Sequence, residues 1–169
     1  MVSGPDAAVP DGLARQLRGS GGCLVPAGFA RRQALGGFCA ANRPLLGNLS
    51  AVIKNEFAAV TLSSLDGSPL SRASRMLLTA AARVANTGMK CNEKRTSLVD
   101  WGAAPTLIEP VAGTVTLRNL RGASGVEAVA LDGAARPLGQ PIAARRTPAG
   151  WEIPIGEPAA PWHAVRVRR

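Results

Sequence analysis

The densest cluster of side chains that could do chemistry lies between residues 86 and 102, in the stretch NTGMKCNEKRTSLVDWG. It contains the acids Glu93 and Asp100, and Glu109 follows it closely. Hydrolysis of a glycosidic bond usually needs two carboxyl groups about 5–10 Å apart. Glu93 and Asp100 could reach such a separation across a hairpin. The three acids are therefore the candidate catalytic residues of a small hydrolase, acting on a glycosidic, ester or lactone bond.

The same stretch has a structural interpretation, which we favour. Asparagine, aspartate and glutamate beside glycine and threonine commonly close turns and accept hydrogen bonds from backbone N–H groups. Asn86 and Asn92 suit turns, and Arg95 could pair with the carboxylate of Glu109. In this interpretation the stretch ties the β-fold together and does no catalysis.

A tryptophan at the surface would offer a face on which a sugar ring can stack. Trp101 precedes a glycine in a loop-like region and is the best candidate for exposure, whereas Trp151 alternates with isoleucines and is predicted to pack in the core. The candidate carbohydrate-binding residues are therefore Trp101, Asn92 and Arg95.

Other chemistries find little support in the sequence. His163 is the only histidine, and Cys23, Cys39 and Cys91 are scattered without a C-x-x-C spacing, so we predict no metal site. No nucleophile elbow, phosphate-binding loop or dinucleotide fingerprint occurs, and no cofactor is predicted. A Cys91–His163 pair is conceivable, but single residues of these types on strands more often serve packing.

The net charge of +9 comes mainly from arginine, since only Lys54, Lys90 and Lys94 of the 20 basic residues are lysines. Arginine binds phosphate and carboxylate well, so a binder of acidic polymers is one alternative. The arginines are scattered and no aromatic platform interleaves with them, so nucleic acid is not the expected partner. No apolar run approaches the roughly 20 residues of a membrane span, and no signal peptide is recognised. Cellular location and oligomeric state stay open.

From about residue 50 the apolar residues alternate, as in half-buried strands. Three segments show one apolar face each: Met76, Leu78 and Ala80; Val111, Val115 and Leu117; and His163, Val165 and Val167. Turn signals such as Asp66-Gly67, Ser124-Gly125 and Asp132-Gly133 separate the segments. Residues 50–169 are therefore predicted to form an all-β antiparallel sandwich, Ig-like or jelly-roll-like.

Residues 1–49 lack this regular alternation. Two segments, residues 10–19 and 29–42, could form short helices, the second interrupted by Gly36-Gly37, and disorder is the alternative. We therefore expect an irregular, partly helical or disordered N-terminal segment. Deletion of residues 1–45 should then leave a folded β domain.

A family resemblance is carried by the segment FAAVTLSSLDGSPLSRASRMLLTAAARVANTGMKCNEKRTSLVDWGAAPTLIEPVAGTVTLR. The sequence resembles the C-terminal β-domain of large bacterial glycoside-hydrolase-like proteins, in which a catalytic barrel precedes β-domains. The resemblance covers about residues 50–169 and is most specific over residues 57–118. Two departures are an aromatic expected where Cys91 stands and another expected near His163. The barrel, whose strand ends would carry the catalytic acids, has no counterpart here. The resemblance therefore implies a non-catalytic accessory domain that binds carbohydrate weakly or serves as an interaction module, and it carries over no catalytic residue.

Overall fold

The computed structural model describes residues 25–38, 45–94 and 96–169, and every regular element in these ranges is a β-strand. The body of the molecule is built from eleven of the strands. They are β1 (Val25–Phe29), β2 (Arg32–Phe38), β3 (Leu49–Ile53), β4 (Phe57–Ser64), β5 (Arg75–Ala81), β10 (Gly113–Leu117), β11 (Gly125–Leu131), β12 (Ile142–Ala143), β13 (Arg145–Thr147), β14 (Gly150–Ile155) and β15 (Trp162–Arg168).

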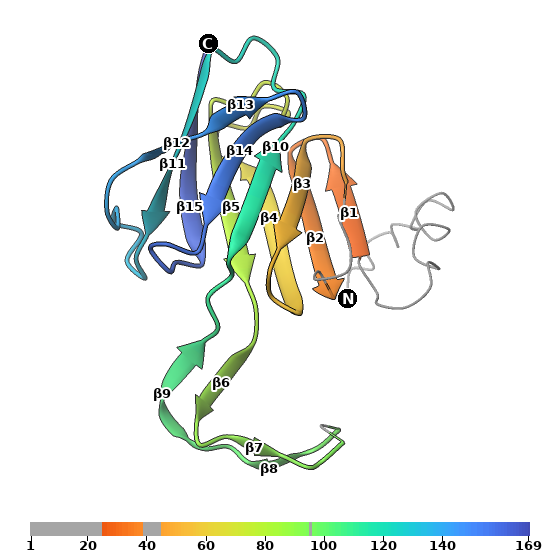
Figure 1. Ribbon diagram of the computed structural model, residues 1–169, viewed down its shortest axis with the longest axis vertical. Helices are drawn as coiled ribbons and strands as arrows, with labels where there is room; N and C mark the ends of the chain where they lie inside the picture. Colours follow the sequence, from red (N-terminus) through yellow and green to blue (C-terminus); the bar gives the residue numbers. More distant parts are fainter. Residues whose placement is uncertain (1–24, 39–44, 95) are drawn as a thin grey trace, which may run out of the picture.

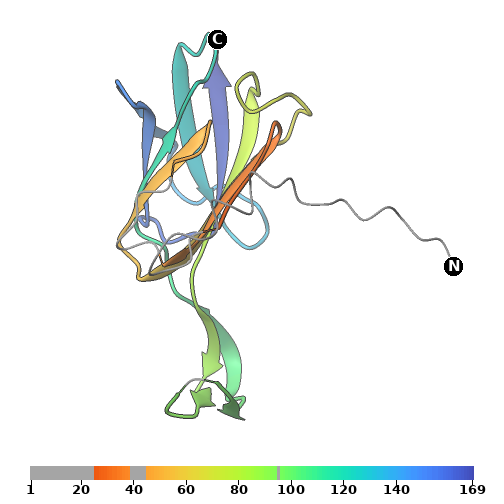
Figure 2. The same cartoon turned by 90° about the vertical axis from the view of Figure 1, so that its right-hand side faces the viewer.

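These strands form two antiparallel sheets that pack face to face (Figure 1, Figure 2). The larger sheet has the order β1-β2-β4-β5-β15-β11-β12, and the smaller has the order β13-β14-β10-β3. One cluster of buried side chains from both sheets fills the space between them. The predicted all-β antiparallel sandwich is therefore confirmed.

The alternation in the sequence explains which side chains enter this core. In β5, Met76, Leu78 and Ala80 are buried, and in β15 His163 and Val165 are buried. The register places His163 opposite Leu78 and Val165 opposite Met76, so the two apolar faces coincide. Directly opposite residues of an antiparallel pair lie on the same side of the sheet, which makes this face continuous across the strands.

The predicted boundary at residue 49 is wrong for part of the N-terminal segment. Residues 25–38 form the hairpin β1–β2, and β2 pairs with β4 along its whole length, from Arg32 opposite Ser63 to Phe38 opposite Phe57. A helix over residues 29–42 is thereby excluded for the described residues of that range. Gly36-Gly37 hid the alternation, because glycine contributes no side chain to either face of the strand. The expected helix over residues 10–19 lies outside the described residues.

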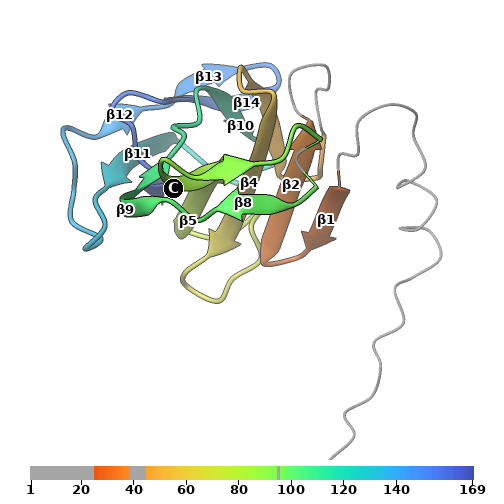
Figure 3. The same cartoon turned by 90° about the horizontal axis from the view of Figure 1, so that it is seen from below.

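A long arm leaves the body between β5 and β10 (Figure 1). It consists of two successive two-stranded ribbons. The first pairs β6 (Val84–Thr87) with β9 (Ala103–Ile108), and the second pairs β7 (Lys90–Cys91) with β8 (Leu98–Asp100). The second ribbon turns away from the direction of the first, as Figure 3 shows from below, where β8 and β9 lie in front of the sheets. The stretch singled out in the sequence forms most of this arm.

Candidate functional site

A network of polar contacts fixes the root of the arm to the body. The Arg83 guanidinium donates from Nε to Glu109 Oε2 at 2.8 Å, and Asn55 Nδ2 donates to Glu109 Oε1 at 2.9 Å. Asn55 Oδ1 in turn accepts from the backbone N–H of Ala112 at 2.9 Å. The hydrogen bonds from Arg83 and Asn55 lower the pKa of Glu109. Glu109 is thus an ionised anchor at neutral pH, and its carboxylate has its partners within the fold.

The elbow between the two ribbons depends on Gly102. Both ribbons are irregular at this point, with register shifts at Asn86/Thr87 and at Lys90/Cys91. Gly102 has a φ of 66°, and a Cβ there would lie 2.3 Å from the carbonyl oxygen of Thr87. Only glycine fits such a close approach of two backbones. The elbow therefore has a defined geometry set by the local sequence.

Trp101 lies at this elbow, between β8 and β9. Asn86 holds its backbone, because Nδ2 of Asn86 donates to the Trp101 carbonyl at 3.1 Å while Oδ1 accepts from the Thr106 hydroxyl at 2.8 Å. The Trp101 side chain itself is 75% exposed. Its predicted exposure is confirmed, and the ring is accessible to a ligand.

The tip of the arm is a turn closed by Asn92. Its Oδ1 accepts from the backbone N–H groups of Thr96 at 2.9 Å and Ser97 at 3.3 Å, and its Nδ2 donates to the Thr96 hydroxyl at 3.0 Å. The amide of Asn92 is therefore used within the turn, as the structural interpretation predicted. Arg95, the third candidate carbohydrate-binding residue and the expected partner of Glu109, lies outside the described residues.

The three candidate acids occupy three different parts of the arm. Glu93 is exposed in the tip turn, and Asp100 lies at the elbow opposite Lys90, where its Oδ1 accepts from the Gly102 N–H at 2.9 Å. Glu109 lies at the root. Of the three acids, Asp100 and Glu109 bond to neighbouring groups of the arm and the body, and Glu93 is exposed.

The most prominent feature of the arm is exposed apolar surface. Val84, Val99, Trp101, Leu107 and Ile108 are each more than half exposed. The register places Val84 opposite Ile108 on one face of the first ribbon, and Leu107 opposite Ala85 on the other face. A two-stranded ribbon is marginally stable by itself in water, and apolar surface of this kind usually marks a contact site. The arm thus offers apolar side chains on both faces.

These side chains should contribute little to the stability of the isolated chain. We expect Leu107→Ser to change the free energy of unfolding by less than about 0.5 kcal/mol, because Leu107 is exposed on a projecting ribbon. Thermal denaturation followed by circular dichroism measures the effect. The matched control is Leu117→Ser, at a fully buried position, which should lower the melting temperature far more. Equal shifts for the two variants would contradict the assignment of Leu107 to a contact surface.

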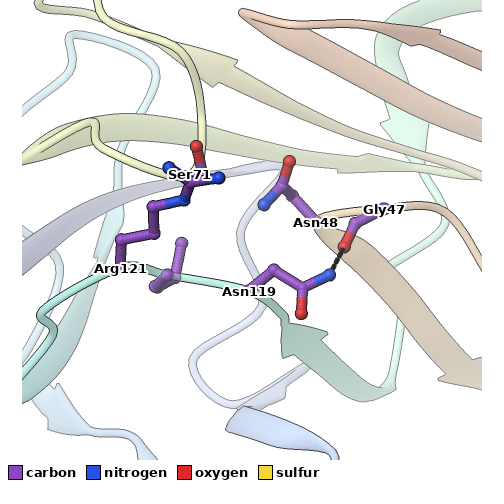
Figure 4. Close-up of a pocket in the computed structure, with 6 residues that line it drawn as sticks. Gly47, Asn48, Ser71, Asn119 and Arg121 are labelled. Atoms are coloured by element: carbon purple, nitrogen blue, oxygen red, sulfur yellow. Dashed lines mark hydrogen bonds between the residues drawn. The ribbon is translucent and has the colours of Figure 1, made fainter.

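A pocket of about 510 Å³ lies at the opposite end of the body, where the loops of both sheets meet (Figure 4). It is lined by Gly47, Asn48, Ser71, Asn119, Leu120 and Arg121. Asn48 Nδ2 donates to the Arg118 carbonyl at 2.9 Å, and Asn119 Nδ2 donates to the Gly47 carbonyl at 2.6 Å. Nothing in the sequence indicates this pocket. Its lining comes from three distant segments, and only the register of the strands reveals that they are neighbours.

The described ranges 25–38, 45–94 and 96–169 lack a candidate metal-binding cluster and a membrane-spanning helix. They contain no group of three or more His, Cys, Asp or Glu side chains suited to hold a metal ion. Cys91 is exposed on the arm, whereas His163 is buried in the body, so the two are not paired. In those ranges no helix has the length and apolarity needed to cross a bilayer.

Comparison of the chain with models of protein families, with curated proteins and with solved structures gives no match. The resemblance of residues 50–169 to the β-domains of glycoside-hydrolase-like proteins therefore stays a prediction from the sequence.

Proposed function

We propose that this chain is a non-catalytic β-sandwich accessory module of the kind that accompanies glycoside hydrolases, and that its arm is the surface that docks on a partner protein. One observation carries the proposal: the arm projects from the body with exposed apolar side chains on both faces. A ribbon with two apolar faces fits into a groove that covers both of them. Burial in such a groove would remove apolar surface from water, which favours binding.

The acids of the arm support a structural role over a catalytic one. Glu109 anchors the root through Arg83 and Asn55, and Asp100 caps the backbone at the elbow. A general acid needs a pKa near the working pH, whereas the pKa of Glu109 is lowered. The proposed role of this stretch is therefore to shape the arm.

A direct test uses the partner that the resemblance implies. A purified bacterial glycoside-hydrolase barrel, stripped of its own C-terminal β-domain, is mixed with this chain and analysed by sedimentation velocity. We expect a complex that Ile108→Ser weakens at least fivefold, while Leu65→Ser does not, because Leu65 is equally exposed but lies on the body. Absence of a complex, or equal weakening by both variants, would refute arm docking.

Weak carbohydrate binding is the second candidate, favoured by the exposed ring of Trp101. Titration calorimetry with neutral oligosaccharides should then show binding that Trp101→Ala weakens at least fivefold. Trp162→Ala is the matched control, because Trp162 is 38% exposed and lies on β15 of the body. If both variants bind as the parent does, sugar stacking on the arm is ruled out.

The alternative of a stand-alone hydrolase is tested with aryl glycosides and aryl esters. We expect no turnover by the purified chain, and none by the Glu93→Gln and Asp100→Asn variants. Turnover that falls about a hundredfold or more in either variant at an unchanged melting temperature would establish the arm as an active site.

A further inference from the structure

The loop end of the body, at the opposite end from the arm, gathers arginines from distant parts of the sequence. The register places Arg32 opposite Ser63 at the end of β4, and Arg75 at the matching end of β5 opposite Arg166. Arg118 and Arg121 follow the same end of β10. Several of the scattered arginines of the sequence therefore lie together at one end of the folded protein.

Hydrogen bonds between loops show that these residues share one surface. The backbone N–H of Arg121 donates to the Ser71 carbonyl, and that of Leu70 donates to the Ala30 carbonyl. The guanidinium of Arg169 donates to the Arg121 carbonyl at 3.1 Å and to the Ala73 carbonyl at 3.0 Å. Segments around residues 30, 70, 120 and 169 are thus tied together.

The charge of this end is not balanced within the described part of the protein. In the described part of the protein, the arginines that form ion pairs with carboxylates are Arg83, Arg136, Arg145 and Arg168. Six arginines at the loop end have no such pair: Arg31, Arg32, Arg72, Arg75, Arg118 and Arg121. An unbalanced cluster of this size produces a positive field that attracts anionic ligands.

Asp66 is the acid in the loop between β4 and β5, and its carboxylate is already engaged. It accepts hydrogen bonds from the backbone N–H groups of Ser68 at 3.1 Å, Ser74 at 2.7 Å and Arg75 at 3.2 Å. These bonds and that of the Ser64 hydroxyl hold the pKa of Asp66 well below its usual range, against the opposing effect of desolvation. Asp66 therefore stabilises the loop, because its carboxylate accepts hydrogen bonds from backbone N–H groups of the loop.

The pocket in this basic end has the groups that an acidic sugar needs. Arg121 and Ser71 lie on one side of it, and Asn48 and Asn119 lie on the other (Figure 4). The Arg121 guanidinium and the Ser71 hydroxyl make no hydrogen bond to the described residues. A guanidinium pairs with a carboxylate through two parallel N–H···O bonds, and amides and hydroxyls pair with sugar hydroxyls.

We propose that this pocket and the arginines around it bind an acidic polysaccharide, with Arg121 on a uronate carboxylate and Ser71, Asn48 and Asn119 on neighbouring hydroxyls. A nucleic acid fits the pocket less well. The only large apolar side chain that lines the pocket is Leu120, and no aromatic ring in the lining is available for a base to stack on. The site is separate from the arm, so it does not depend on the docking role proposed above.

The test compares a galacturonic acid hexamer with a galactose hexamer by titration calorimetry on the intact chain. We expect the acidic hexamer to bind and the neutral hexamer to bind at least tenfold more weakly, with affinity falling as salt rises. Arg121→Ala should weaken binding of the acidic hexamer about tenfold. Arg72→Ala, at an exposed loop position, should weaken it severalfold and provides a second variant if Arg121→Ala does not fold.

Arg136→Ala is the matched control, because it removes the same charge from the loop after β11, at the opposite end of that strand from the basic end. It should leave the affinity nearly unchanged. Equal losses for Arg121→Ala and Arg136→Ala, equal binding of the two hexamers, or no binding of either would overturn the proposal. Tighter, Arg121-dependent binding of single-stranded DNA or polyglutamate of matched charge would also overturn it, and would reassign the site.

Discussion

A chain that lacks residues 1–45 should lose its cooperative thermal transition, contrary to the expectation from the sequence that such a chain still folds. The deletion removes β1 and β2, and β2 pairs with β4 along its whole length. It also removes Leu35, which is 1% exposed and belongs to the core cluster. Without β2, the apolar strand β4 becomes an unpaired sheet edge, which promotes aggregation. Circular dichroism against temperature checks this result.

A point variant at Leu35 tests the contribution of core packing without removing the strands β1 and β2. Leu35→Ala should cost about 2–5 kcal/mol, the range for buried leucines, which is a large part of the stability of a small domain. Leu65→Ala is the control, because Leu65 is 54% exposed and should change stability by less than about 0.5 kcal/mol. A truncated chain that melts cooperatively near the temperature of the parent would show that the body is complete from residue 46.

The body of this fold could be predicted where strands bury one face only. Met76 and Leu78 in β5, and Val165 in β15, follow a period of two because their neighbours face away from the core. The β1–β2 hairpin was not predicted, because glycines have no side chains and therefore leave no alternation of apolar and polar residues in the sequence. Trp151 was correctly placed against the core, although it is only partly buried, with Arg146 stacked over its ring at 5.5 Å.

The candidate site was predictable in part for a different reason. Turn chemistry is local, so Asn92 could be assigned to a turn from its neighbours in the sequence. The length and direction of the arm depend on the pairing of β6 with β9, whose residues are too exposed to show an amphipathic pattern. The basic end depends on long-range pairing in the same way, because only the register of the two sheets brings Arg32 and Arg121 to the same end of the body.

The buried histidine His163 should make the stability of the protein depend on pH. It lies on the core side of β15, opposite Leu78 and Ala130, and is 2% exposed. Its Nδ1 atom has no hydrogen-bond partner among the described residues. Burial disfavours the charged imidazolium and lowers the pKa of His163. The folded chain therefore resists protonation at a pH where the unfolded chain accepts it.

The stability of the protein should consequently fall as the pH drops below about 6.5, the ordinary pKa of histidine in an unfolded chain. Above that pH both states are neutral at His163 and its contribution is complete. Below it the unfolded chain gains a proton first, so the free energy of unfolding decreases by up to about 1.4 kcal/mol for each pH unit. Because His163 is the only histidine and carboxylates titrate near pH 4, the window from pH 6.5 to 5 isolates this residue.

Urea denaturation at pH 7, 6 and 5 measures the effect, and His163→Met is the matched variant. Methionine fills a similar space, makes no demand for a hydrogen bond and does not titrate, so its stability should be nearly constant over this window. The parent and the variant should differ most in the slope against pH, whatever their relative stability at pH 7. The same slope in both proteins would assign the effect to carboxylates and would show that His163 accepts a proton inside the fold at little cost.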